Sequence, residues 1–124
     1  MAERINLTIS SLHQAYAQKT TPSDVIRQIY CQIDKVGDPN IFICLFPEKE
    51  LLAAAQALGD FNPDQPLWGV PYVVKDNIDV LGKPTTAGCP EFTYIADNSA
   101  FVVKCLQKAG ALLLGKTNLD QFAT

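Results

Sequence analysis

The sequence has a single histidine, His13, and no pair of cysteines separated by two residues. Because His13 is the only histidine and lies in the predicted N-terminal helix, we expect neither a Ser-His-Asp triad nor a multi-histidine metal site from this chain. The four cysteines, Cys31, Cys44, Cys89 and Cys105, are too widely spaced for a zinc ribbon or a thioredoxin-type dithiol. We therefore expect reduced thiols, no metal and no cofactor, and we expect His13 to lie on a helix surface or to pack against a helix.

Long apolar runs and clusters of positive charge are also missing. No apolar run approaches the roughly 18 residues that cross a membrane, and the first residues lack the apolar stretch of a signal peptide. The formal net charge is −3, and lysine and arginine are scattered singly, so no basic stripe is available to nucleic acid. We expect a cytoplasmic protein with no membrane contact and no direct contact with nucleic acid.

Serine is scarce as well. Ser10, Ser11, Ser23 and Ser99 all lie at predicted helix starts or in the N-terminal arm, where a hydroxyl commonly caps a helix. The chain has no Gly/Ser-rich segment, internal repeat or low-complexity stretch. With 124 residues and 48% hydrophobic content, it can build one modest core.

Helices and strands alternate along the chain. Thr21 as cap, Pro22 at the first helical position and Asp24 three residues after the cap predict a helix start, and Gly37 predicts its end. Helices are predicted at about residues 10–18, 22–36, 48–58 and 99–109, and strands at 41–46, 70–74 and 111–114. This order predicts an α/β fold with helices packed on a mixed, largely parallel central sheet, in which the last two strands are central. The inner face of the fourth helix is expected to consist of Phe101, Val102, Cys105 and Leu106.

A lysine ends the second predicted strand. Residues 70–74 are uncharged and lead directly into Lys75, after which Asp76 and Asn77 turn the chain. Burial of such a lysine disfavours its ammonium form, and a fall in its pKa from about 10.4 to about 7 corresponds to roughly 4 to 5 kcal/mol. Lys75 is therefore a candidate general base. The plainer alternative is a lysine whose stem packs while its head reaches water.

Three further charged residues receive structural interpretations. Asp76 and Asp79 can form paired carboxylates, but we interpret them as Asx-turn residues beside Lys75. Lys116 is interpreted as an ion-pair partner or a solvated lysine and not as a second base.

Residues 110–117 satisfy the phosphate-loop pattern of Gly, four residues, then Gly-Lys-Thr. The context is wrong, because a helix is predicted before Gly110 and the four intervening residues are themselves a predicted strand. We expect Gly115 to permit a sharp exit from that strand, and Asn118 to cap a helix beginning at Leu119.

Three segments carry a resemblance to a known family. The sequence is Asp-Asn-Ile-Asp-Val at 76–80, Pro-Thr-Thr-Ala-Gly-Cys-Pro at 84–90 and Asn-Leu-Asp-Gln-Phe-Ala-Thr at 118–124. Together with Lys75, these segments resemble the amidase signature family, and most of all the amidase domain of allophanate hydrolases. The resemblance is close over about residues 68–124, whereas residues 1–67 agree only in layout.

The resemblance implies that residues 1–124 are the N-terminal part of one amidase domain, with a helical arm plus a first strand and helix at 1–60 and the signature segment at 61–124. It also implies a triad of lysine, cis-peptide serine and nucleophilic serine. Only Lys75 maps onto this sequence, since both serines of the family follow later in a Gly/Ser-rich segment. By the same resemblance, Gln121 and Thr124 border the substrate pocket; a helix-surface residue and a chain end are the plainer interpretations.

The implied activity is hydrolysis of a linear C–N amide bond in a small molecule by a homodimer, most closely allophanate hydrolysis in urea degradation. A general amidase and the A subunit of a tRNA-dependent amidotransferase share much of the pattern. A non-enzymatic α/β module is the alternative of another class if the chain ends at Thr124. Residues 1–124 alone are expected to be inactive and poorly soluble, because one of three catalytic groups is present and the predicted strands lack neighbours.

Overall fold

The computed structural model of the protein describes residues 4–124. The helices of this part are α1 (Ile9–Ala17), α2 (Pro22–Val36), α3 (Glu48–Ala57) and α4 (Phe101–Lys108). Its strands are β1 (Phe42–Leu45), β2 (Pro71–Lys75), β3 (Pro84–Thr85), β4 (Tyr94–Ile95) and β5 (Leu112–Thr117). Short 3-10 turns cover Pro90–Phe92 and Gln121–Ala123. No helix in residues 4–124 is long and apolar enough to cross a membrane.

The main sheet has the order β1-β5-β2. Strand β5 pairs with β1 in the antiparallel sense and with β2 in the parallel sense, so the sheet is mixed as predicted. Strand β5 is central as predicted, whereas β2 has one strand neighbour within residues 4–124, so its central place in a complete sheet stays a prediction. A separate antiparallel pair of β3 and β4, which the sequence did not indicate, lies outside this sheet.

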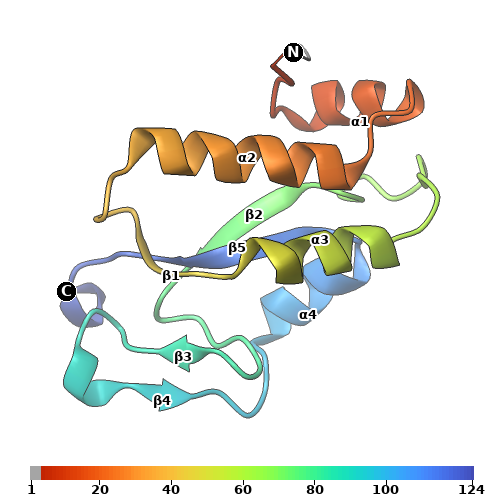
Figure 1. Cartoon of the computed structure of the whole chain (residues 1–124). Helices are drawn as coiled ribbons and strands as arrows, with labels where there is room; N and C mark the ends of the chain where they lie inside the picture. Colours follow the sequence, from red (N-terminus) through yellow and green to blue (C-terminus); the bar gives the residue numbers. More distant parts are fainter. Residues whose placement is uncertain (1–3) are drawn as a thin grey trace.

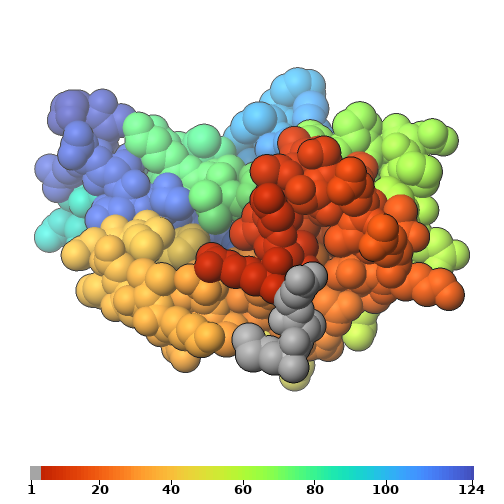
Figure 2. Space-filling view, turned by 90° about the horizontal axis from the view of Figure 1, so that it is seen from above, coloured from red at the N-terminus to blue at the C-terminus, as the bar shows by residue number. Residues whose placement is uncertain are grey.

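Helices cover the sheet from more than one side. In Figure 1, α1 and α2 lie above the sheet, while α4 and the β3–β4 pair lie below it. Figure 2 looks down on the upper face and shows residues of α1 and α2 side by side across it. The core joins these layers: Ile26 of α2, Leu51 of α3, Val103 of α4 and Leu112 and Leu114 of β5 belong to one buried cluster. Burial of such side chains is the main force that holds helices on the sheet.

A smaller aromatic cluster holds α1 against the loop before β2. Tyr16 and Trp68 are buried and meet edge to face, with ring centroids 5.4 Å apart. The Tyr16 hydroxyl donates to the carbonyl of Gly69 at 2.6 Å, and burial raises the pKa of this hydroxyl. His13 packs edge to face on Phe61, and its Nε2 lies 3.2 Å from the carbonyl oxygen of Trp68. The prediction of a packing role for His13 is confirmed.

Helix ends follow the sequence signals in part. Thr21 and Asp24 form a reciprocal capping box at the start of α2, and Gly37 ends the helix in the left-handed region at φ 64°. The prediction that serines cap helices is wrong, because the hydroxyl of Thr8 caps α1. The Ser99 hydroxyl instead accepts from the backbone N–H of Leu81, which ties a turn to the chain before α4.

The predicted inner face of α4 is wrong for Phe101, Val102 and Cys105, which are exposed, and holds only for Leu106. Val103 is fully buried, whereas Phe101 is 81% exposed and Val102 is 51% exposed. The helix begins at Phe101, and the face that carries Val103 and the half-buried Leu106 points toward the core. All of these residues are apolar, so composition alone did not distinguish the face that points inward.

Gly115 has a packing role instead of the expected role in leaving the strand. It lies inside β5, and a Cβ built on it would stand 2.5 Å from the carbonyl oxygen of Cys44 on β1. The ladder between β1 and β5 changes register between Phe42 and Cys44, and that between β2 and β5 changes register between Tyr72 and Val74. Glycine therefore permits the close approach of β1 where the pairing is irregular.

We expect Gly115→Ala to destabilise the protein by about 3 kcal/mol, at the upper end for overpacking, because the contacted atom is backbone and cannot rotate away. Gly82→Ala is the matched control: no atom lies within 4 Å of its added Cβ. That control should lose only the roughly 1 kcal/mol of a left-handed alanine. Chemical denaturation of both variants measures the difference, and equal losses would contradict the close-approach role.

Candidate functional site

Lys75 lies at the carboxyl end of β2, where it is exposed. Its ladder partner on β5 is Thr117, while the preceding residue, Val74, is the partner of Lys116. Paired residues project from the same face of a sheet and successive residues from opposite faces, so Lys75 projects away from the face that carries Lys116. Within residues 4–124 Lys75 is thus exposed, like Val73 on the same face of β2, which is 44% exposed. This agrees with the plainer alternative for the described part of the chain, and desolvation by other parts of the protein stays a prediction.

A buried ion pair lies on the inward face. Lys116 Nζ is 2.9 Å from Asp76 Oδ1, and both side chains have no exposed surface. Lys116 also donates to the carbonyl of Pro84 at 3.0 Å and to the Thr85 hydroxyl at 3.3 Å. These three acceptors match the three N–H bonds of an ammonium group. The interpretation of Lys116 as an ion-pair partner is confirmed.

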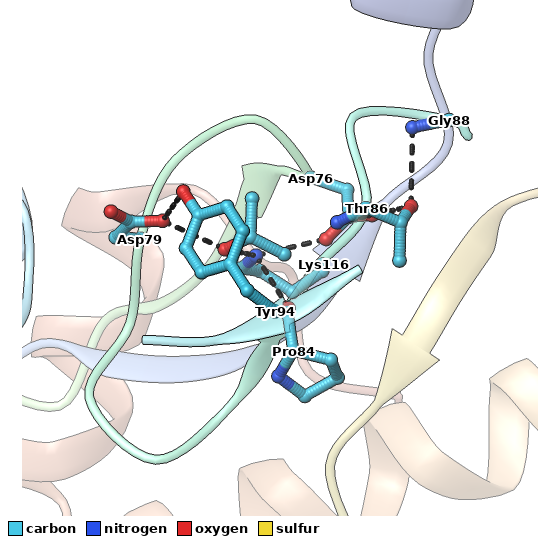
Figure 3. A network of polar contacts seen from close by, with 8 residues as sticks. Asp76, Asp79, Pro84, Thr86, Gly88, Tyr94 and Lys116 are labelled. Carbon is cyan, nitrogen blue, oxygen red and sulfur yellow. Dashed lines mark hydrogen bonds and ion pairs between the residues drawn. The ribbon is translucent and has the colours of Figure 1, made fainter. Parts of the chain in front are cut away.

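The second carboxylate oxygen of Asp76 anchors the loop after β3. Oδ2 accepts from the Thr86 backbone N–H at 3.1 Å and from the Thr86 hydroxyl. The same hydroxyl accepts from the backbone N–H of Gly88 at 3.1 Å. Figure 3 shows Asp76 between Lys116 and Thr86, with the chain continuing to Gly88. Each charge of the pair is thus surrounded by hydrogen-bond partners, as a buried ion requires.

Asp79 belongs to a second, more exposed group of contacts. Its Oδ1 accepts from the Thr85 hydroxyl at 2.8 Å and from the Tyr94 hydroxyl at 2.7 Å. The bond from Tyr94, helped by the Thr85 bond and the positive charge of Lys116, lowers the pKa of the Asp79 carboxyl below its usual value. The bond to Asp79 raises the pKa of the Tyr94 hydroxyl in turn.

The Asx-turn interpretation of the two aspartates is wrong. Asp76 bonds to Lys116 and Thr86, and Asp79 bonds to Thr85 and Tyr94, so each carboxylate contacts residues six or more positions away. The paired-carboxylate alternative also fails, since the two carboxylates have separate partners. Local sequence favours turn bonds for aspartate, but here tertiary contacts with distant donors prevail.

The segment after β5 does not form the predicted helix at Leu119. Asn118 accepts only from the adjacent backbone N–H, and a 3-10 turn begins later at Gln121. Gln121 and Thr124 are both exposed, and the backbone of Gln121 lies against Gly88, where an added Cβ would stand 3.2 Å from the Gln121 Cα. Their role in a substrate pocket stays a prediction.

The rejection of a phosphate loop agrees with the structure. Helix α4 precedes Gly110, and β5 runs from Leu112 to Thr117 through the glycine-lysine-threonine triplet. The lysine of the pattern is the buried Lys116, bound to Asp76. A hollow among residues 4–124 lies elsewhere, between the N-terminal arm and α2, where Ile5 and Gln28 line it.

The bond from Tyr94 to Asp79 predicts a pH-dependent contribution to stability. A carboxylate with a lowered folded-state pKa stabilises the protein above its unfolded pKa of about 3.9, and this is lost as pH falls through the folded value. Tyr94→Phe should therefore destabilise the protein more at pH 6 than at pH 3.

The matched control is Tyr30→Phe, because the Tyr30 hydroxyl donates to the neutral carbonyl of Phe46 at 2.7 Å. The loss of unfolding free energy in Tyr30→Phe should be the same at both pH values. Chemical denaturation at pH 6 and pH 3 measures the four differences, and a pH-independent loss for Tyr94→Phe would contradict the charge-assisted bond.

Comparisons with known proteins place the chain in a family. A family model described as Amidase matches residues 24–124. Urea amidolyase of Saccharomyces cerevisiae is 51% identical over 87 residues, which cover 68% of this chain and 5% of that protein. The A subunit of the glutamyl-tRNA(Gln) amidotransferase of Methylacidiphilum infernorum is 38% identical over 119 residues, covering 94% of this chain and 24% of that protein.

Solved structures give the same result. An allophanate hydrolase of Kluyveromyces lactis matches with a TM-score of 0.78 and 35% identity, over 100% of this chain and 21% of that chain. The chain thus spans between 5% and 24% of the length of these three relatives. The family match covers most of the chain and the structural match all of it, and both include β2, the 84–90 segment and β5. The chain belongs to the amidase family.

Proposed function

We propose that this chain contributes the lysine of an amidohydrolase that cleaves a linear C–N amide bond, with allophanate as its substrate in urea degradation. The observation that carries the proposal is the 51% identity with a urea amidolyase over 87 residues. The match to an allophanate hydrolase over the whole chain supports it. A small-molecule amide, a cytoplasmic location and a homodimeric complete enzyme belong to the same proposal.

Lys75 acts as the general base in this proposal. In its neutral form it takes a proton from a cis-peptide serine, which relays it from a nucleophilic serine, and an acyl-enzyme forms that water resolves. The two serines and the oxyanion donors belong to sequence beyond residues 1–124. Residues 1–124 alone are therefore inactive in this proposal.

The placement of Lys75 supports this role. It lies at the carboxyl end of a strand with its side chain exposed, and it forms no ion pair within residues 4–124. Its amine is therefore free to meet a serine from another segment. A neutral lysine requires desolvation, and the groups that cover Lys75 in the complete enzyme must supply it.

A second candidate function is that of the A subunit of a tRNA-dependent amidotransferase. It is favoured by 38% identity over 94% of this chain with a protein of that kind. That relative matches at lower identity than the urea amidolyase but over more of the chain. Both candidates need an amide-cleaving serine site, so the preferred substrate distinguishes them.

We expect the full-length protein that carries this chain to release ammonia from allophanate faster than from acetamide, propionamide or glutamine. Ammonia release at matched substrate concentrations gives the relative values of kcat/KM. Comparable or slower turnover of allophanate than of acetamide would reassign the protein to the general amidases, and a preference for glutamine would favour the amidotransferase.

We expect Lys75→Met to keep the fold and to lower kcat by about three orders of magnitude or more, because it removes the group that accepts the proton. Lys104→Met is the control, since Lys104 is an exposed lysine on α4. The wild type should lose activity on acidification as Lys75 becomes protonated. Near wild-type turnover by Lys75→Met at neutral pH would exclude the base role.

A further inference from the structure

Asp76, one partner of the buried ion pair with Lys116, directly follows Lys75 in the sequence. The carboxylate of Asp76 is bound to Lys116 and Thr86, and its backbone is bound as well. The Asp76 N–H donates to the carbonyl of Thr117 at 3.1 Å, and its carbonyl accepts from the N–H of Ala87 at 3.2 Å. Side chain and backbone together fix the residue that follows Lys75.

The pair is not accessible to a substrate within residues 4–124. The three N–H groups of the Lys116 ammonium donate to Asp76, Pro84 and Thr85. Both carboxylate oxygens of Asp76 accept hydrogen bonds, one from Lys116 and the other from Thr86. Both side chains have no exposed surface. Such a pair acts through the residues that it holds and not by direct contact with a reacting group.

Three segments distant in sequence meet at the pair. They are the end of β2, the end of β5 and the 84–88 loop, and the loop in turn accepts a hydrogen bond at Ala87 from the N–H of Phe122. The pair therefore fixes the strand end that carries Lys75 relative to the segment that carries Gln121. Figure 3 shows the strand end, the loop and Lys116 converging.

The charges of the pair also act on Lys75. An unbalanced carboxylate at Asp76 would favour the ammonium form of its neighbour, and an unbalanced ammonium at Lys116 would disfavour it. The closed pair presents both charges together, so the two effects largely cancel.

Other titratable groups near this end of the sheet are accounted for. Asp79 and Tyr94 face the pair through Thr85 and bond to each other. Asp120 is exposed on the chain that continues from β5. On α3, Glu50 pairs with Lys83. All of these groups are unchanged in the variants of the pair considered below.

We propose that Asp76 and Lys116 form a positioning pair for Lys75. Together they fix its strand end, and they present opposite charges beside it, so that neither charge acts on its amine alone. The proposal rests on the proposed role of Lys75 as the base. It assigns a task to two residues that touch neither substrate nor serine.

The test uses the full-length protein that carries this chain and compares Lys116→Met, Asp76→Asn and the double variant. Lys83→Met is the control, because it breaks the partly exposed pair with Glu50. The readout is the pH profile of kcat/KM on allophanate, or on whichever amide the wild type hydrolyses. Circular dichroism gives the folded fraction, to which each rate is normalised.

We expect the acid limb of the pH profile to move to higher pH in Lys116→Met and to lower pH in Asp76→Asn, with the double variant near the wild type. Each single variant should also lose about 10- to 100-fold in the plateau kcat, as Lys75 is displaced. Lys83→Met should match the wild type in both measures. Loss of folded protein alone cannot produce shifts of opposite sign.

If the acid limb of the pH profile does not move in either single variant, or moves in the same direction in both, the proposal is overturned and the pair is purely structural. If the single variants do not fold, Thr86→Val decides, because it removes one donor to Asp76 and leaves Lys116 in place. Thr86→Val should move the acid limb of the pH profile to higher pH by less than Lys116→Met does, and Thr86→Ser should restore the wild-type profile. An acid limb that does not move in Thr86→Val overturns the proposal. Full activity in Lys75→Met would instead refute the proposed function, which separates the two failures.

Discussion

A lysine and an aspartate share an interior that is otherwise mostly hydrocarbon, and the end of the sheet depends on how they meet. Transfer of either ion from water into that interior is costly, and the loss is offset only when the partner and further hydrogen bonds are in place. Lys116 and Asp76 fulfil this condition with Pro84, Thr85 and Thr86. Removal of one partner would leave a buried charge, so the surrounding loop must hold a single arrangement.

The main strand pairings explain why this arrangement is possible. The parallel ladder sets Val74 opposite Lys116 and Lys75 opposite Thr117, which directs the two lysines to opposite faces. One lysine becomes a structural ion and the other stays accessible at the same sheet end. Gly115 admits β1 close to β5 beside this point, so the irregular register and the buried lysine are accommodated together.

Local signals in the sequence predicted the elements well. The capping box of Thr21 and Asp24, the end of α2 at Gly37 and the three strands of the main sheet appear where expected, since each depends on neighbouring residues, although β5 continues to Thr117. The β3–β4 pair was missed because two-residue strands carry no periodic pattern. The face of α4 was misjudged because apolar residues occur on several of its sides.

The site was predictable only in its local part. The position of Lys75 at a strand end followed from the apolar run before it, and Lys116 was recognised as a partner in an ion pair. The identity of that partner depends on strand register, which short-range patterns do not contain. For the same reason, the sequence did not show that the inward face of β2 excludes Lys75.

The partners of the buried ion pair are 40 residues apart in the chain. The whole β3–β4 pair and α4 lie between them, so a long loop must close before the contact of Lys116 with Asp76 forms. Contacts of such sequence separation slow folding and cannot be present in a locally ordered fragment. The ends of β2 and β5 therefore acquire their geometry together with the global fold. Local unfolding of either strand displaces Lys75 and separates Asp76 from Lys116 at the same time.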